Sequence, residues 1–272
     1  MTKMGRKKGV AVSEVEEEEV GEEEKVRAVE EMEGSSARCH LCHQPRLPKP
    51  LEGGKLYTLG HGEERVTVHY FCMLFTYNSR QVGEEQEGLF GFYLGEVRRQ
   101  VAAAAGRRCR YCALGGATAR CDRKHCGVSM HFPCGQAAGA CFQFTGRMTI
   151  YCGAHRPRQK VEGLPSPPDT ECVICFEEVE QGAAAWLRLR APCCGRHLHS
   201  SCVQSFAFTS GSEHFKCPNC NNKDAILREF MKMGIYFPHK DAEWELPQNS
   251  NFYNFQDHYV TTRRDQSRVL RI

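Results

Sequence analysis

The stretch CRYCALGGATARCDRKHCGVSMHFPC, residues 109–134, decides the fold, because its cysteines and histidines recur at the spacing of zinc ligands. One later pair completes the set, and eight donors in four pairs suit two tetrahedral zinc ions. The four pairs are Cys109-x2-Cys112, Cys121-x4-Cys126, His131-x2-Cys134 and Cys152-x2-His155.

Spacing alone leaves two ways to share these pairs between two metals. In the sequential arrangement each zinc takes two neighbouring pairs. In the interleaved arrangement the first and third pairs bind one zinc, and the second and fourth bind the other. The interleaved arrangement ties non-local loops together, so it compensates better for a small apolar core.

The cysteine content of the whole chain supports zinc rather than disulfides. The 272 residues include 17 cysteines, and no apolar run reaches the length of a membrane span or resembles a signal peptide near the start. We therefore expect an intracellular protein with no membrane segment. Disulfides are rare inside cells. A secreted disulfide scaffold is disfavoured because histidines lie inside the cysteine clusters. Each structural zinc would supply about 10–16 kcal/mol towards folding.

Two more groups of pairs flank this stretch. The first group could form one Cys3His site, with His40 and His43 as bystanders, because adjacent side chains point in different directions. The third group follows the proline-rich segment VEGLPSPPD, which marks a domain boundary. The pairs of the first group are Cys39-x2-Cys42 and His69-x2-Cys72, and those of the third are Cys172-x2-Cys175, His199-x2-Cys202 and Cys217-x2-Cys220.

The third group needs one more half-site for a second zinc, and the segment APCCGRHLHSSC, residues 191–202, must provide it. The candidates are Cys193, Cys194 and His197. Cys194 with His197 has the cleaner chelate spacing, and Cys193 with Cys194 is the alternative. Either choice brings the expected total to five zinc ions. Cys141 has no partner at metal spacing and is expected to be a small core residue.

Residues 39–155 resemble an extended PHD finger. The resemblance rests on the Cys-Cys-His-Cys knuckle, on the bridging segment GLFGFYLGEVRRQV and on the ending YCGAH. It implies a zinc knuckle at residues 39–72, a bridging helix at about 95–105 and a PHD finger at 109–155. It also implies the interleaved, cross-brace sharing of the four pairs.

The third module, residues 172–221, resembles both PHD and RING fingers through ECVICFEEV, CPNC and the aromatic Phe215. Together with the following segment FMKMGIYFPHKDAEWE, the chain resembles the family of PHD finger protein 7 and the G2/M-phase-specific ubiquitin ligase. We expect this chain to lack a counterpart of the catalytic domain that ends that ligase. The family uses adjacent cysteines in its third module, so the resemblance favours Cys193 with Cys194 and leaves His197 as the alternative to Cys193.

The expected fold class is therefore a set of small zinc-stabilised α+β modules: an extended PHD finger and a second cross-brace finger. An acidic tail at residues 1–38, which carries eleven acidic and seven basic residues, is expected to be disordered. Residues 156–171 are expected to be a linker, and residues 222–272 a C-terminal extension.

Closed zinc sites leave no open position for water or substrate, so function should come from surfaces that the zincs hold rigid. The resemblance implies a RING-type ubiquitin-protein ligase that docks a ubiquitin-conjugating enzyme on Ile174 and Pro218 and positions its thioester for attack. Many active RINGs carry a basic residue after the last cysteine, but here that residue is Asn221, and Lys223 comes two positions late. A reader without enzymatic activity is the rival hypothesis.

A basic segment indicates a second surface, suited to the phosphates of nucleosomal DNA. Only Asp122 opposes its eight basic residues, and a solvated basic face or plain RNA or DNA binding are the alternatives. The residues are Arg98, Arg99, Arg107, Arg108, Arg110, Arg120, Arg123 and Lys124.

PHD fingers bind histone tails, so the resemblance also implies histone or nucleosome partners and a nuclear protein that acts on chromatin. An import signal over residues 3–8 would agree with that location. Trp186 is a candidate wall of a methyl-lysine cage, although a lone tryptophan in a finger more often packs in a core.

Overall fold

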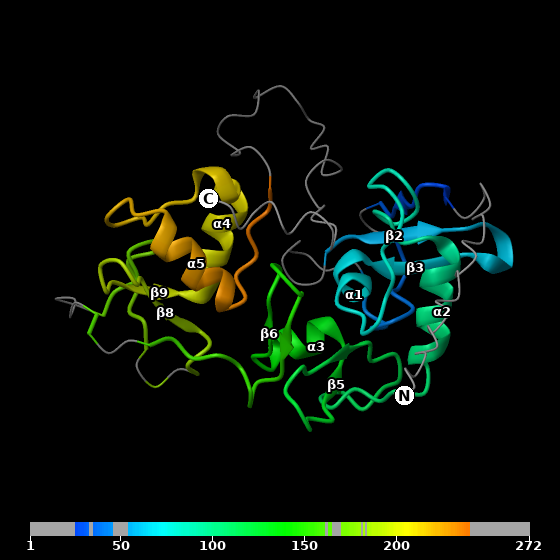
Figure 1. Cartoon of the computed structure of the whole chain (residues 1–272), viewed down its shortest axis with the longest axis horizontal. Coiled ribbons are helices and arrows are strands. Elements are labelled where there is room, and N and C mark those ends of the chain that lie inside the picture. Colours follow the sequence, from blue (N-terminus) through cyan, green and yellow to red (C-terminus); the bar gives the residue numbers. More distant parts are fainter. Residues whose placement is uncertain are drawn as a thin grey trace, which may run out of the picture.

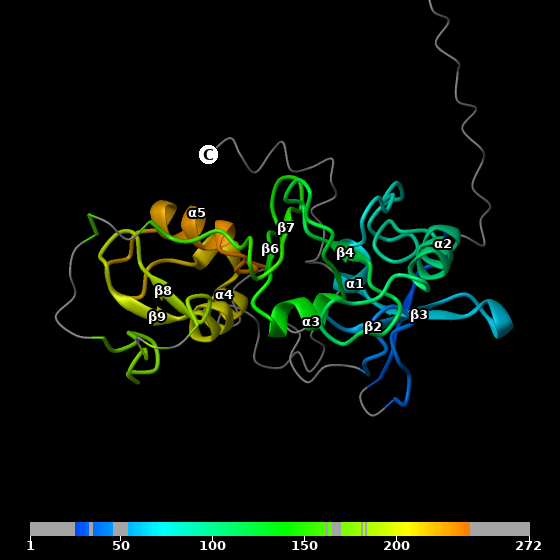
Figure 2. The same ribbon diagram turned by 90° about the horizontal axis from the view of Figure 1, so that it is seen from below.

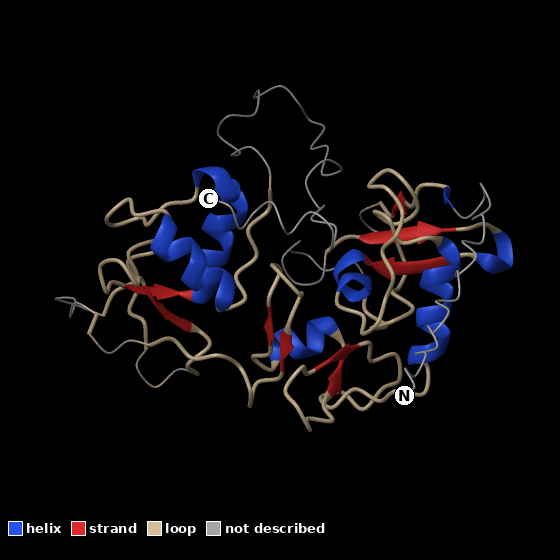
Figure 3. Ribbon diagram, in the orientation of Figure 1, coloured by secondary structure: helices blue, strands red, loops and turns tan. Residues whose placement is uncertain are grey.

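The computed structural model describes residues 25–32, 35–45, 54–160, 163–164, 170–180, 182 and 184–239. Figure 1 shows the third module at one end of the described residues, the PHD finger in the middle and the knuckle region at the other end. Figure 3 shows that loops make up much of each body, as expected where metal sites replace long strands. The predicted class of small zinc-stabilised modules is confirmed. None of the helices in the described ranges has the length and apolarity to cross a bilayer.

The knuckle region is built on a three-stranded antiparallel sheet in the order β1 (Val29–Glu30), β2 (Leu56–Leu59) and β3 (Val66–His69). The short helix η3 (Gly62–Glu64) lies between the last two strands, and α1 (Tyr70–Leu74) follows directly. Leu56 pairs with His69 in the register, so the sheet delivers this histidine to the metal side of the module.

Strand β1 belongs to the segment that the sequence predicts to be disordered. Residues 25–32 and 35–38 are ordered instead, because β1 pairs with β2 and its acids find partners there. Lys55 lies 2.6 Å from Glu30, and Arg65 donates to Glu31 at 2.7 Å. The acidic run and the basic residues before position 25 lie outside the described residues.

Helix α2 (Leu94–Ala104) lies where the sequence predicts a helix over about 95–105. Val97, Gln100 and Ala104, at i, i+3 and i+7, are its buried residues. This stripe packs into a core that the knuckle region and the PHD finger share, with no boundary between them.

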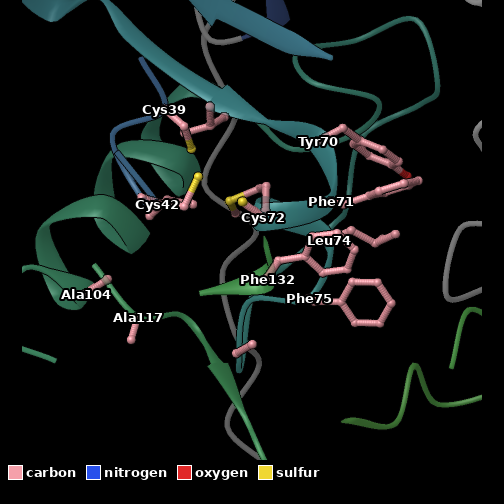
Figure 4. Close-up of a cluster of buried hydrophobic side chains, with 14 of the residues drawn as sticks. Cys39, Cys42, Tyr70, Phe71, Cys72, Leu74, Phe75, Ala104, Ala117 and Phe132 are labelled. Carbon is pink, nitrogen blue, oxygen red and sulfur yellow. The ribbon is translucent and has the colours of Figure 1, made fainter. Parts of the chain in front are cut away.

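The shared core is rich in aromatic side chains. The rings of Phe71 and Phe75, from α1 and the residue after it, lie 5.5 Å from the ring of Phe132 in the PHD finger. Figure 4 shows these rings beside the sulfur atoms of the knuckle cysteines. The extended PHD finger is therefore one packed body.

The PHD finger itself contains two short hairpins around one helix. Strands β4 (Ala119–Arg120) and β5 (Ser129–Met130) pair, α3 (Phe132–Ala137) follows, and β6 (Cys141–Phe142) pairs with β7 (Ile150–Tyr151). Strands of two residues hold few ladder hydrogen bonds, so the metals must supply much of the stability.

The third module has its own core around β8 (Arg188–Arg190), β9 (His197–His199), α4 (Ser200–His214) and α5 (Asp224–Lys232). The module extends beyond residue 221, because α5 buries Ile226 and Phe230 in this core. Residues 240–272 of the expected C-terminal extension lie outside the described residues.

Candidate metal centres

The structure brings the predicted ligands together as five tetrads. Within each tetrad one donor atom from every residue lies within 4.8 Å of the others. The second and third tetrads combine pairs in interleaved order, and the last contains the adjacent cysteines. The tetrads are Cys39–Cys42–His69–Cys72, Cys109–Cys112–His131–Cys134, Cys121–Cys126–Cys152–His155, Cys172–Cys175–His199–Cys202 and Cys193–Cys194–Cys217–Cys220.

The separations between donor atoms are close to those that a tetrahedral zinc site requires. Bond lengths of about 2.3 Å to sulfur and 2.0 Å to nitrogen place tetrahedral ligands roughly 3.5–3.8 Å apart. Cys42 Sγ lies 3.3 Å and Cys72 Sγ 3.8 Å from His69 Nδ1, and Figure 4 shows the knuckle sulfurs turned towards one another. In the last tetrad Cys194 Sγ lies 3.7 Å from Cys217 Sγ. The expectation of zinc as the metal is confirmed by this donor set.

The second ring nitrogen of three ligand histidines supports the same conclusion. Nε2 of His69, His131 and His199 lies 3.2, 2.8 and 3.2 Å from the carbonyl oxygens of Pro45, Gly115 and Glu178, respectively. A carbonyl only accepts, so Nε2 carries the proton and Nδ1 offers its lone pair to the metal. Metal-bound histidines in proteins are typically oriented in this way.

A common turn presents the C-x2-C pairs. In each, the amide of the first cysteine donates to a carbonyl five residues on, and the residue after the second cysteine adopts a left-handed conformation. These left-handed residues are His43 (φ 61°), Ala113 (φ 63°), Phe176 (φ 62°) and Asn221 (φ 57°). The conformation is uncommon outside glycine, so these residues accept backbone strain that metal binding offsets.

The segment APCCG repeats this turn with one change, and this explains the ligand choice in the last tetrad. The Ala191 amide donates to the Arg196 carbonyl, and the Gly195 amide donates back to the Ala191 carbonyl at 2.8 Å. Gly195, with φ 74°, takes the left-handed position. Cys194 therefore occupies the place of the second cysteine, while alanine occupies the place of the first.

Cys193 supplies the donor that the alanine lacks, and its sulfur lies 3.3 Å from that of Cys220. His197 is not in the tetrad; it lies in β9, paired with Arg190 in the strand register. Of the two alternatives, the structure thus assembles Cys193 with Cys194.

We expect Cys193→Ser to reduce the zinc content of the folded chain from five ions to four, because the tetrad would lose one thiolate. His197→Ala should retain five. Native mass spectrometry of both variants measures the count directly. Five zincs in C193S together with four in H197A would show that the histidine is the ligand.

In the first turn of the third module, backbone amides favour the thiolate form of Cys172. Burial alone would raise the pKa of the Cys172 thiol, but the amides of His199, Cys175 and Ile174 donate to its sulfur and lower the pKa to about 7. A thiolate is the form that binds metal, so the turn prepares the ligand.

The residues expected to be bystanders lie outside the tetrads. His40 Nδ1 lies 2.9 Å from the Thr67 carbonyl, and His43 Nε2 lies 3.0 Å from the Gly115 carbonyl. Cys141 is buried, and burial raises the pKa of its thiol to about 11. Trp186 packs against Gly139 of the PHD finger, where a Cβ would approach the indole ring to 2.5 Å.

The expected docking residues lie on the metal loops of the third module. Ile174 is half-buried between two zinc ligands, and Pro218 is exposed between two others. Phe176, which the sequence analysis did not single out, is 77% exposed next to Cys175. Its place directly after a C-x2-C pair, where a polar or small residue would be ordinary, was the available signal.

The basic segment divides into paired and unpaired side chains. Arg98 lies 3.2 Å from Glu64, Arg99 contacts Glu96, and Arg120 lies over the Tyr77 ring at 4.8 Å. Among the described residues no carboxylate lies within ion-pair distance of the remaining five, which are Arg107, Arg108, Arg110, Arg123 and Lys124.

Comparison with known proteins supports the PHD-like part of the fold. Residues 69–156 match the model of a PHD-like zinc-binding domain. The G2/M phase-specific E3 ubiquitin-protein ligase of Homo sapiens is 37% identical over 195 residues, or 71% of this chain and 27% of that protein. The Pineapple eye protein of Drosophila melanogaster is 31% identical over 67% of this chain and 31% of that protein. Histone-lysine N-methyltransferase 2D of Mus musculus is 24% identical over 60% of this chain and 3% of that protein.

The chain thus spans less than a third of the length of these relatives. The resemblance to the G2/M-phase-specific ubiquitin ligase that the sequence motifs predict is nevertheless confirmed, because 37% identity extends over 71% of this chain. The chain is a zinc-finger protein with a PHD-like zinc-binding domain, and over 195 residues it is a homologue of the G2/M phase-specific E3 ubiquitin-protein ligases.

Proposed function

We propose that the chain is a RING-type ubiquitin-protein ligase whose third module recruits a ubiquitin-conjugating enzyme. The observation that carries the proposal is the complete pair of tetrads in that module. A RING performs no covalent chemistry; it orders the thioester of the bound enzyme for attack by a lysine, and this requires a rigid platform. The relatives' printed name, E3 ubiquitin-protein ligase, agrees with this activity.

The docking surface in this proposal consists of Ile174, Phe176 and Pro218. Two of these side chains are exposed and the third is half-buried, so a partner would remove apolar area from water. Asn221 closes the last metal turn in the left-handed conformation, in which its amide donates to the Cys217 carbonyl at 2.9 Å. Asparagine tolerates this conformation well, which gives the residue a structural role in place of the basic contact that many RINGs make there.

An autoubiquitination assay with a panel of conjugating enzymes tests the proposal. Ubiquitin conjugates are expected with at least one enzyme when native mass spectrometry shows five bound zincs. If fully zinc-loaded protein yields no conjugate with any enzyme, the third module is a binding platform and the rival hypothesis of a non-enzymatic reader holds.

We further propose that the basic segment directs the ligase to nucleosomes in the nucleus, by contact with DNA phosphates. Support comes from the five basic side chains that have no acidic partner among the described residues. Phosphate contacts release counterions, so binding should weaken steeply with salt and show little sequence preference.

The triple variant Arg108→Ala, Arg110→Ala and Arg123→Ala should weaken nucleosome binding and reduce its salt dependence. Each lost phosphate contact lowers the slope of log K against log salt by about 0.9, so a change of roughly 2–3 is expected. Arg98→Ala with Arg99→Ala is the matched control, because acids already partner both residues. Fluorescence polarisation across a salt series gives both slopes. An unchanged slope in the triple variant would contradict the proposal.

A further inference from the structure

The segment that follows α5 lies between the third module and the extended PHD finger. Figures 1 and 2 both show it leaving α5 next to β6 of the PHD finger. Ile235 and Phe237 are buried in the core of the third module, where the Phe237 ring lies 4.7 Å from that of Phe215. In an extended chain, alternate side chains point to opposite sides, so Tyr236 points away from that core.

Tyr236 points into the shared core of the extended PHD finger. Its ring lies 5.2 Å from the ring of Phe71 and 4.6 Å from that of Phe144. Its main chain is held from the other side, because Gln204 of α4 accepts from its amide at 3.0 Å and donates to its carbonyl at 2.8 Å. One residue thus belongs to both modules.

Polar contacts reinforce this attachment. The guanidinium of Arg156 donates to the Ala140 carbonyl at 3.1 Å, on the PHD side, and to the Met233 carbonyl at 2.6 Å, on the other. The side chain of Gln143 donates to the Lys232 carbonyl at 2.8 Å. Arg156 is half-buried, and a guanidinium removed from water is stable only where acceptors surround it.

The backbones of the third module and the PHD finger also approach each other closely along this interface, which we call the seam. A Cβ on Gly234, which has φ 85°, would lie 3.0 Å from Cys141 Sγ and 3.1 Å from the Phe142 carbonyl oxygen. Gln159, just after the PHD finger, accepts from the Arg190 amide of β8 at 2.9 Å and donates to its carbonyl at 3.0 Å. With Trp186 over Gly139, the seam has contacts along much of its length.

We infer that residues 232–237 form an intramolecular clamp that locks the third module onto the extended PHD finger and so sets the distance between the enzyme-docking surface and the basic segment. A flexible linker of sixteen residues, over 156–171, would by itself let its ends separate by about 20 Å on average. The clamp replaces this freedom with one geometry. If the proposed ligase function holds, this fixed geometry makes the clamp a positioning device that selects the target lysine. Misplacement of the reacting groups lowers rates steeply.

The clamp can be tested without any activity measurement, by amide ¹⁵N relaxation of the zinc-loaded intact chain. A single rotational correlation time is expected for both modules in the wild type. In the double variant Tyr236→Ala, Arg156→Ala the third module should tumble independently and faster. Two different correlation times in the wild type would overturn the inference, as would one common time in the double variant.

Matched controls separate the clamp from general damage. Tyr236→Phe keeps the ring, and Arg158→Ala removes an exposed arginine two residues away, so both should retain a single correlation time. Native mass spectrometry should find five zincs in every variant. Fewer ions in the double variant would mean that loss of a metal site caused the change in tumbling. The zinc-loaded single variants Arg156→Ala and Tyr236→Ala would then be compared with the wild type, and one common correlation time in both would overturn the inference.

The positioning role is measured by comparing two reactions. The double variant should lose at least tenfold in nucleosome ubiquitination while its autoubiquitination stays within about twofold of the wild type. Equal nucleosome ubiquitination in the two proteins would overturn the positioning role. Absence of any conjugate with the wild type would refute the proposed ligase function alone, because the relaxation data judge the clamp independently.

Discussion

Replacing Ile174 by alanine is expected to lower the rate of autoubiquitination at least tenfold while all five zincs stay bound. The side chain is half-buried in the metal loop, so the part of it that remains exposed is available to a docked conjugating enzyme. Loss of about 1.5–2 kcal/mol of apolar burial corresponds to a factor of roughly ten or more in affinity. Initial rates at a subsaturating concentration of conjugating enzyme give the ratio.

Val173→Ala serves as the control for Ile174→Ala, because it changes the neighbouring residue of the same loop, which is also half-buried. Its rate should stay within about threefold of the wild type. A zinc-loaded Ile174→Ala protein with wild-type activity would show that the third module does not dock the enzyme through this loop.

Removing the zinc ions should unfold the modules altogether. Each structural zinc contributes about 10–16 kcal/mol, which is as large as the whole stability of a typical domain. We expect treatment with a strong chelator to abolish the near-ultraviolet circular dichroism and the cooperative thermal transition, and added zinc to restore both.

Mass spectrometry must show that the chelated protein is metal-free before the circular dichroism and thermal data are interpreted. Cys141→Ser is a matched control, since it removes a buried cysteine that belongs to none of the five tetrads. It should keep five zincs and its response to chelation. Native-like tertiary signals in protein shown to be metal-free would contradict the view that the metals hold the modules together.

The metal centres were largely predictable from the sequence, because each ligand pair is local and its spacing is set by one tight turn. The ligand choice in APCCG was less certain from spacing. It depends on Ala191 taking the place of a cysteine in the turn, which only the hydrogen-bond pattern reveals. The partition into modules was also harder to predict, because α5 and β1 join their modules through packing and pairing between residues far apart in the sequence.

The seam between the modules was not visible in the sequence at all. Tyr236 looks like any aromatic residue after an amphipathic helix, and Arg156 like one more base after the last ligand. Their roles depend on Phe71, Phe144 and the carbonyl of Met233, which are brought together only by the finished fold. Trp186, considered for a methyl-lysine cage, contributes to the same seam.

Discharge of ubiquitin from a preloaded conjugating enzyme onto free lysine tests most directly whether the third module activates a ubiquitin thioester. This single-turnover reaction needs neither nucleosome nor target protein, so it isolates the module's own effect. The zinc-loaded chain is predicted to accelerate discharge at least tenfold with one or more conjugating enzymes, and Ile174→Ala should remove the acceleration. Discharge at the uncatalysed rate with every enzyme, from protein carrying five zincs, would contradict activation by this module.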